Sequence, residues 1–106
     1  MFFELRQYRM RPGQRENWIR FMDEVIIPFQ VSKGMIIVGS FAGEEDEGLY
    51  VWIRRFADED ERVRQYDAVY QSDVWKSEIA PRIPEMMDRE AIKVTRMEAT
   101  PRSIIR

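Results

Sequence analysis

The sequence predicts one α+β domain, in which two helical regions cover a single face of a four-stranded antiparallel sheet. Its 106 residues are the length of one domain, and its 44% apolar and 34% charged residues form a globular balance. Segments with strand-like and helix-like periodicity follow one another in the order β-α-β-β-α-β. This order is typical of the split βαβ arrangement, whose sheet carries both helices on one side. We therefore expect a single domain over residues 1–106, with a core of 1–99 and a C-terminal tail of 100–106.

The first half of the chain contains one strand, one helix and a hairpin. Phe2–Met10 alternates in polarity and ends at an Arg-Pro-Gly turn signal, which predicts a strand. Residues 14–31 carry apolar side chains at helical spacing, and Pro28 is expected to kink or close that helix. The β-branched, apolar residues 35–41 predict a strand buried on both faces. An acidic, glycine-bounded loop then leads into Leu49–Phe56, which indicates a β-hairpin with a solvated tip.

The second half of the chain contains a broken helical region and a final strand. Asp58 and Glu61 resemble a capping box that opens a helix with an apolar stripe. That stripe comprises Val63, Tyr66 and Tyr70. A short helix with Trp75 and Ile79 is expected to follow, and the pair Pro81 and Pro84 is expected to terminate it. Residues 92–98 alternate in polarity and predict the last strand.

The sheet face without helices needs a cover. We expect Phe3 and Leu5 to point toward the helices and the bulkier alternate set to face away from them. That set comprises Tyr8, Met10, Tyr50, Trp52 and Phe56. Because a large apolar face exposed to water favours association, we expect a homodimer with its two sheets face to face, with higher oligomers left open. Ile104 and Ile105 in the tail are expected to contact the partner.

The composition excludes several classes of function. The chain has no Cys and no His, so disulfides, thiolate sites and histidine-bound metal or haem are not expected, and we predict no metal and no cofactor. The net charge is -2 and the charges are scattered, so we expect neither nucleic acid nor membrane as a partner. No apolar run approaches the ~18 residues of a membrane span. A cytoplasmic protein is the expectation.

Polar residues on two strands form a candidate site. Side chains alternate along a strand, so Glu4, Arg6 and Tyr8 project from one side, and Trp52 and Arg54 share the same two-residue period. Residues of the broken helix are expected to form a rim. The candidate ligand-binding residues are Glu4, Arg6, Tyr8, Trp52, Arg54, Tyr70 and Trp75, and no catalytic residue is assigned.

Two interpretations of this cluster remain open from the sequence. In the first, Glu4 and Arg6 neutralise each other, Arg54 finds another carboxylate, and the ion pairs fix the register of the dimer. In the second, Arg6 and Arg54 bind an anionic or carbonyl-bearing ligand, Tyr8 donates a hydrogen bond, and Glu4 acts as a base if burial raises its pKa. Spacing alone does not separate the two interpretations.

Several motifs in the chain resemble the NIPSNAP family. Residues 3–13 contain Glu-Leu-Arg-Gln-Tyr before a Gly-containing turn, which is similar to the opening signature of that family. Other similar segments are 38–41, 51–56, 61–62 and 70–75. The resemblance implies a ferredoxin-like βαββαβ protomer of the dimeric α/β-barrel superfamily, in which two sheets enclose a central cavity. Members of that superfamily include cofactor-independent monooxygenases, haem-degrading enzymes and decarboxylases. Trp52 stands where many relatives carry His, so His-based chemistry is not carried over.

The predicted function is binding of a small anionic or carbonyl-bearing molecule in the cavity between the two sheets of a homodimer. A metal-free, monooxygenase-like activity is the hypothesis for its chemistry. The alternative is a non-catalytic, dimeric protein-interaction module that presents its helical outer surface. A cavity that reaches solvent would favour ligand binding, whereas a cavity filled by side chains would favour the module.

Overall fold

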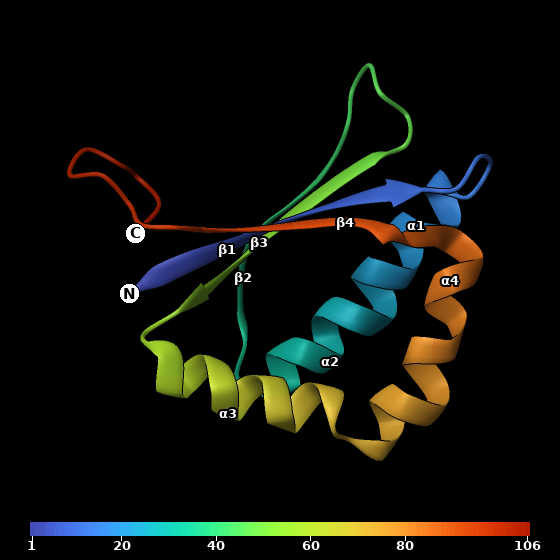
Figure 1. Ribbon diagram of the computed structural model, residues 1–106. Coiled ribbons are helices and arrows are strands. Elements are labelled where there is room, and N and C mark those ends of the chain that lie inside the picture. Colours follow the sequence, from blue (N-terminus) through green and yellow to red (C-terminus); the bar gives the residue numbers. More distant parts are fainter.

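The computed structural model describes all 106 residues and shows an antiparallel sheet with every helix on one of its faces (Figure 1). The strands are β1 (Phe2–Met10), β2 (Ile36–Ala42), β3 (Leu49–Phe56) and β4 (Met87–Met97). Their spatial order is β2-β3-β1-β4, so the first and third strands are central. This order confirms the predicted βαββαβ topology and the ferredoxin-like fold. No helix is both long enough and apolar enough to cross a membrane.

The first helical region continues past the proline that was expected to kink or close it. It runs through α1 (Arg15–Phe21), a π-helical segment (Met22–Ile26) and α2 (Ile27–Ser32). Pro28 has no N–H to donate to the carbonyl four residues earlier. The chain widens just before it, where the N–H of Ile27 bonds to the carbonyl oxygen of Met22, five residues back. A local π-helical turn therefore accommodates the proline without ending the helix.

The second helical region is also longer than predicted. It consists of α3 (Glu59–Tyr70), a π-helical segment (Trp75–Ile79), a 3-10 turn (Ala80–Arg82) and α4 (Ile83–Met86). The prediction that Pro81 and Pro84 terminate it is wrong, because each proline lies at the start of a new segment, where a missing N–H costs little. In the predicted stripe of α3, Val63 is exposed and Val69 is buried instead.

Strand β2 is not buried on both faces, which corrects a second expectation. It lies at the edge of the sheet and pairs only with β3, and Ile36 and Phe41 are 41% and 55% exposed. An uninterrupted apolar run is typical of a central strand but does not prove a central position. The exposed side chains instead contribute to the sheet face that carries no helix.

The two faces of the sheet are the reverse of those predicted. The even-numbered side chains of β1 and β3 point toward the helices, where Tyr8, Tyr50 and Trp52 pack around the fully buried Trp18. Met10 and Phe56 are buried on the same side. Because strand side chains have a period of two, a shift of one residue in the assignment moves the whole set to the other face. The aromatic set belongs to the protomer's own core.

The open face of the sheet therefore carries the odd-numbered side chains of β1 and β3, some apolar and some polar. In register across β1 and β3, Leu5 lies opposite Ile53 and Gln7 lies opposite Val51. Phe41 of β2 adds an exposed ring to this face. The tail turns back on this side, where Arg55 donates a hydrogen bond to the carbonyl of the last residue, and Figure 1 shows it rising opposite the helices. Ile104 in the tail is 99% exposed.

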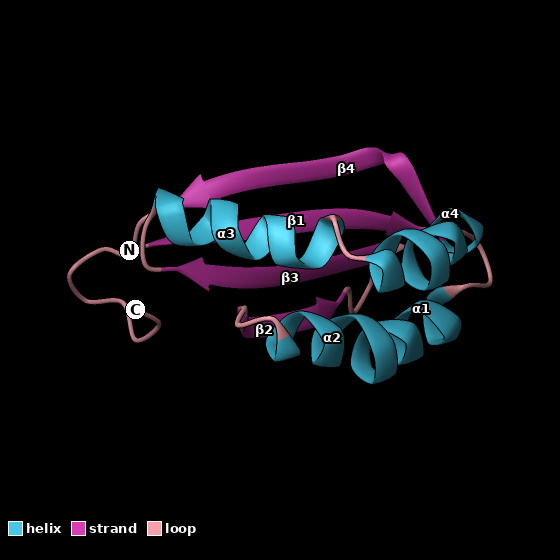
Figure 2. Ribbon diagram, turned by 90° about the horizontal axis from the view of Figure 1, so that it is seen from below, coloured by secondary structure: helices cyan, strands magenta, loops and turns pink.

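The helices do not cover all of the inner face. Figure 2 shows them under β1, β2 and β3, while the middle of β4 extends beyond them. Val94 in that part of β4 lies opposite Arg6, whose side chain faces the helices, yet Val94 is 46% exposed. The space beneath β4 is consequently accessible from one side.

The start of α3 gives a direct test of its capping residue. Asp58 accepts a 2.8 Å hydrogen bond from the backbone N–H of Glu61, which confirms it as the N-cap. We expect Asp58→Ala to lower the free energy of unfolding by about 1 kcal/mol, because one N–H of the first turn loses its partner. Chemical denaturation would measure it. Asp60→Ala removes an exposed carboxylate from the same turn without a capping bond, so an equal loss in both variants would contradict the assignment.

Candidate functional site

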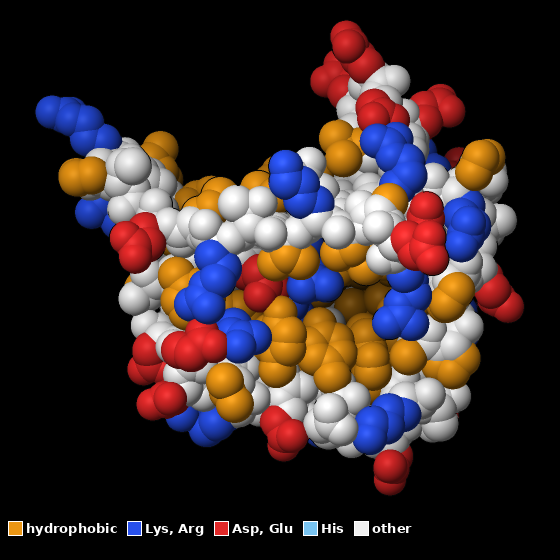
Figure 3. Space-filling model, viewed as in Figure 1, with side chains coloured by type: hydrophobic (Ala, Val, Ile, Leu, Met, Phe, Trp, Pro, Cys, Tyr) orange, Lys and Arg blue, Asp and Glu red, His pale blue; other side chains and the backbone are white.

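A cavity of about 230 Å³ lies between the sheet and the helices. Figure 3 shows a hollow between the sheet and the helical layer, with hydrophobic side chains inside it and charged side chains at its inner edge. The lining comes from β1, β3, β4 and all the helical regions, so the cavity is a product of the whole fold. Its lining residues are Arg6, Tyr8, Trp18, Met22, Ile26, Trp52, Tyr66, Tyr70, Trp75, Ile83, Met87, Arg89 and Ile92.

An ion pair between Glu4 and Arg54 lies behind the cavity wall. The two residues are directly opposite each other on β1 and β3, and Arg54 Nη2 lies 2.5 Å from Glu4 Oε1. The side chain of Arg54 is fully buried and that of Glu4 is 4% exposed. Neither residue lines the cavity. Buried charges require partners, and each of these two supplies the other's charge.

The helices supply neutral partners for this ion pair. The Tyr66 hydroxyl donates to Glu4 Oε2 at 2.6 Å and accepts from Arg54 Nη2 at 2.8 Å. Arg54 Nη1 donates to the Tyr70 hydroxyl at 2.8 Å and to Gln30 Oε1 at 2.9 Å. Burial and the hydrogen bond to Glu4 raise the pKa of Tyr66 to about 12, although Arg54 opposes the shift. The phenol therefore stays neutral and bridges the two charges.

Glu4 is not a base. Burial alone would raise its pKa, but the Arg54 guanidinium, the Tyr66 hydroxyl and Arg6 together hold the pKa below its ordinary value. The condition on which Glu4 was expected to act as a base, a pKa raised by burial, is not met, because Arg54 and Arg6 both lie close to the carboxylate. Its chief partner is Arg54, and the Arg6 Nη1 atom lies farther away at 3.4 Å. Glu4 is consequently a counter-ion.

Arg6 has no carboxylate of its own. Its Nε donates to the Tyr8 hydroxyl at 2.8 Å, and its side chain is 16% exposed and lines the cavity. Glu4 is shared with Arg54, which holds it at a distance 0.9 Å shorter (3.4 against 2.5 Å). Two guanidiniums and one carboxylate leave one positive charge in excess at the wall of the cavity. Desolvating a charge is costly unless an opposite charge accompanies it.

The other polar groups at the cavity wall are donors. Arginine can only donate, so the Tyr8 and Tyr70 hydroxyls accept from Arg6 and Arg54, and their own protons have no protein acceptor. The pKa of Tyr8 is raised by burial, so its phenol keeps the proton. The indole Nε1 atoms of Trp18 and Trp52 are buried without a hydrogen-bond partner. The wall presents hydrogen-bond donors and positive charge to whatever occupies the cavity.

Five of the seven predicted candidates line this cavity. These are Arg6, Tyr8, Trp52, Tyr70 and Trp75, whereas Glu4 and Arg54 hold the wall from behind. The cavity lies within one protomer, not on the sheet face predicted to pair. Sequence reasoning missed the roles of Tyr66 and Gln30. Both are polar side chains on helices that face a strand with an unpaired Arg, and this pattern could have indicated their roles in the sequence.

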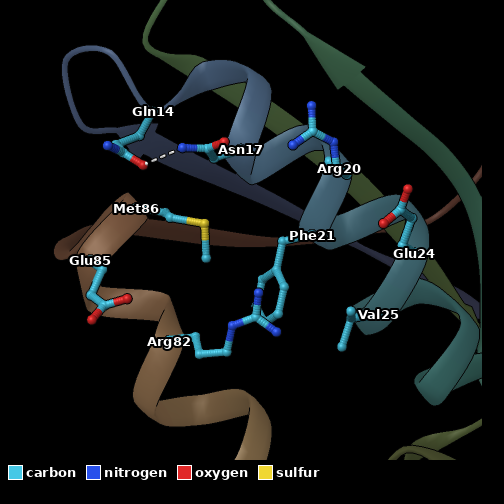
Figure 4. Close-up of a pocket in the computed structure, with 9 residues that line it drawn as sticks. All are labelled: Gln14, Asn17, Arg20, Phe21, Glu24, Val25, Arg82, Glu85 and Met86. Atoms are coloured by element: carbon cyan, nitrogen blue, oxygen red, sulfur yellow. Dashed lines mark hydrogen bonds between the residues drawn. The ribbon is translucent and has the colours of Figure 1, made fainter.

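A second pocket of about 380 Å³ lies at the surface between α1 and α4 (Figure 4). Arg82 stacks on the ring of Phe21, with its guanidinium carbon 4.3 Å from the ring centroid. Its charged lining consists of Arg20, Glu24, Arg82 and Glu85, all exposed. Two charges of each sign in contact with water give this pocket no net preference for a charged ligand. The inner cavity is therefore the better candidate site.

The fold and the cavity define a class of protein: a ferredoxin-like domain whose sheet and helices enclose a donor-lined cavity. Within that class, residues 3–101 match the NIPSNAP family model, and the chain belongs to the NIPSNAP family. The resemblance seen in the sequence motifs is thereby confirmed.

Solved structures agree with this assignment. A NIPSNAP family protein with unknown function from Agrobacterium tumefaciens has a TM-score of 0.89 at 23% identity, over 100% of this chain and 94% of that one. An uncharacterized NIPSNAP domain protein from Burkholderia xenovorans has a TM-score of 0.84 at 15% identity, over 97% and 98%. An antibiotic biosynthesis monooxygenase has a TM-score of 0.67 at 16% identity, over 95% and 100%. No curated protein sequence matches the chain.

The Glu4–Arg54 pair predicts a large, pH-dependent loss of stability in Glu4→Gln. The substitution leaves Arg54 buried without a counter-ion, so we expect the free energy of unfolding to fall by roughly 3 kcal/mol or more at neutral pH. Because the pKa of Glu4 is lower in the folded state, the wild-type advantage should persist above about pH 4.5 and disappear as the pH falls through the folded pKa. Urea titrations across this range would measure both effects.

The matched control is Glu59→Gln. Glu59 also pairs with arginines, Arg62 and Arg96, but its side chain is 48% exposed. Water and salt screen such a pair, so a much smaller loss is expected. Equal losses at the two positions would show that burial does not set the strength of the Glu4 pair.

Proposed function

We propose that this protein binds a small molecule with an anionic or carbonyl oxygen in the cavity between its sheet and its helices. The observation that carries the proposal is the charge imbalance at the cavity wall, where Arg6 and Arg54 share the single carboxylate of Glu4. A ligand oxygen at Arg6 would supply the missing partner. Charge-assisted hydrogen bonds of this kind are stronger than neutral ones.

The hydrogen-bond inventory supports the same class of ligand. The protons of the Tyr8 and Tyr70 hydroxyls have no protein acceptor, so both can donate to acceptor atoms of a ligand. The remainder of the lining is apolar or aromatic. A molecule with an apolar body and acceptor oxygens at one end satisfies both parts of the wall, as is typical of small-molecule sites.

The alternative functions have less support. The test set for the interaction module concerns the cavity between the two sheets of a dimer, which a single protomer does not contain, whereas the cavity described here lies inside one protomer and is hollowed from its surface (Figure 3). A monooxygenase-like activity rests on the likeness to an antibiotic biosynthesis monooxygenase, and at 16% identity that likeness carries the fold alone. Ligand binding is the function that the side chains themselves support.

We also propose that a second copy of this chain covers the open sheet face. The face carries apolar side chains at its centre, where Leu5 lies opposite Ile53, and at its edge, where Phe41 is exposed. The fully exposed Ile104 projects from the tail on the same side. An identical face on a second protomer would bury these side chains in a self-complementary contact. The pairing face and the ligand cavity are then separate surfaces of the sheet.

Light scattering at low micromolar concentration would test the pairing. We expect wild-type protein to have the mass of a dimer and Ile53→Arg to have the mass of a monomer, because a charge at the centre of the face cannot be desolvated. Val63→Arg places the same charge on the exposed surface of α3, where 53% of Val63 is already in water, and should stay dimeric. A monomer mass for the wild-type protein would contradict the proposal.

Arg6 and Arg54 should separate binding from stability. Arg6→Met removes the excess charge, so we expect the free energy of unfolding to change by less than about 1 kcal/mol while anion binding is lost. Arg54→Met leaves the buried Glu4 carboxylate without its chief counter-ion and should lower the free energy of unfolding by roughly 3–5 kcal/mol. Thermal shift with a panel of small carboxylates and keto acids would measure binding. Arg89→Gln is the control, since Arg89 lines the cavity but is exposed.

The proposal fails if no member of the panel raises the melting temperature of the wild-type protein. It also fails if Arg6→Met retains the wild-type shift, because the charge imbalance would then have no part in binding. Loss of binding in Arg89→Gln alone would move the anion site to the mouth of the cavity.

A further inference from the structure

We infer that the ligand of this cavity is a monocarboxylate with an apolar body the size of one aromatic ring, bound with its carboxylate at Arg6. The inference rests on the proposed function. It narrows the class of ligand by three independent observations: the volume of the cavity, the size of the charge imbalance and the aromatic side chains of the lining.

The volume limits the ligand to a small body. A cavity of about 150 Å³ lined by aliphatic and aromatic side chains is sufficient to hold benzene. The present cavity of about 230 Å³ exceeds that by an amount that suits one additional polar group. Drug-sized ligands occupy sites of roughly 300–1,000 Å³. A single ring with a carboxylate fits a cavity of about 230 Å³, whereas a fused two-ring body does not.

The charge imbalance limits the ligand to one negative charge near Arg6. Glu4, Arg6 and Arg54 sum to a single positive charge, which one carboxylate neutralises. The other arginine of the lining, Arg89, is exposed at β4, where water already solvates it. A second carboxylate in the interior would therefore be buried without a cation, which is costly.

Two pairs of aromatic rings in the lining, one from the helical region and one from β1 and β3, suit a flat apolar body. Tyr70 and Trp75 meet edge to face with ring centroids 4.8 Å apart, and Tyr8 and Trp52 meet similarly at 6.2 Å. All four rings line the cavity, together with Ile92 and other aliphatic side chains. Aromatic rings pack favourably with one another in edge-to-face and offset geometries. The apolar end of the ligand would lie among these rings, and its charged end would lie at β1.

The opening beneath β4 provides the route for such a ligand. Val94 on the inner face of β4 is 46% exposed, and Arg89 lies farther along the same strand at the cavity lining. An exposed cation near the opening attracts anions without binding them tightly, since solvent screens it. The strong binding site is then the half-buried Arg6, and the opening serves as the route of approach.

The first test compares probes that differ in one property, with affinity measured by tryptophan fluorescence and thermal shift. We expect benzoate to bind at least about tenfold more tightly than benzamide, because only the acid neutralises Arg6. Benzylamine should not bind. Benzene-1,4-dicarboxylate and 2-naphthoate should each bind at least about tenfold more weakly than benzoate, the first through its second charge and the second through its size.

The second test enlarges the cavity. Ile92→Ala removes a partly buried side chain from the lining and should raise the affinity for 2-naphthoate relative to benzoate by about tenfold. Val94→Ala makes a similar truncation two residues along the strand, outside the lining, and should leave the ratio unchanged. Because the readout is a ratio of affinities, a general loss of stability does not mimic it.

The outcomes separate this inference from the proposed function. Equal affinity for benzoate and benzamide, or tighter wild-type binding of 2-naphthoate or the dicarboxylate, would overturn the ligand class while leaving an occupied cavity. Binding of an aliphatic or keto acid from the wider panel, dependent on Arg6, with no binding of benzoate would do the same. If no compound of either set binds, both conclusions fail.

Discussion

The fully buried guanidinium of Arg54 is the constraint around which the inner face of this domain is arranged. A buried charge is tolerated only with an opposite charge and hydrogen bonds, and the partners of Arg54 come from three different elements. Glu4 comes from β1, Gln30 from α2, and Tyr66 and Tyr70 from α3. One side chain on β3 therefore ties a neighbouring strand and both helical regions together. The register between β1 and β3, in which Glu4 faces Arg54, places the two charges in direct contact.

The same arrangement gives the two arginines different surroundings. Because Arg54 takes the short contact to Glu4, Arg6 is left with a long contact to that carboxylate and a bond to Tyr8. Both arginines lie on the same face of the sheet, in neighbouring pairs of residues across β1 and β3. Arg54 is fully buried, whereas Arg6 lines the cavity. Burial of the ion pair makes Arg54 a structural residue, whereas the proposed ligand binding would depend on Arg6. Of the two alternatives that the sequence left open, the ion-pair network is present between Glu4 and Arg54, and the ligand site remains a proposal for Arg6.

The sequence was sufficient to predict the topology and to select five residues that line one cavity, but not the sheet face on which that cavity lies. Residues 2–10, 49–56 and the helical spacing of 14–31 carry strong local periodicity, and the elements follow it. Choosing a sheet face requires knowing which helix side chains lie opposite. The partners of Arg54 are 12 to 50 residues away, so no local pattern contains that information. The prediction that Pro81 and Pro84 end the helical region failed for a related reason. The helical segments that begin at these prolines depend on the packing of Ile83 and Met86 into the core, which no local pattern contains.

The cavity itself follows from how few elements cover the sheet. Two helical regions lie beneath β1, β2 and β3, and the long edge strand β4 extends past them (Figure 2). The π-helical segments add to the effect, since Met22 and Ile26 come from one and Trp75 from the other, and all three line the cavity. Widened turns displace side chains from their ordinary helical positions, and such turns are frequent at functional sites. Closing the cavity would require a further covering segment over β4, which would also bury Arg6 with its charge uncompensated. The opening and the charge of Arg6 are therefore linked, because an anion could balance this charge only if the cavity stays accessible from solvent.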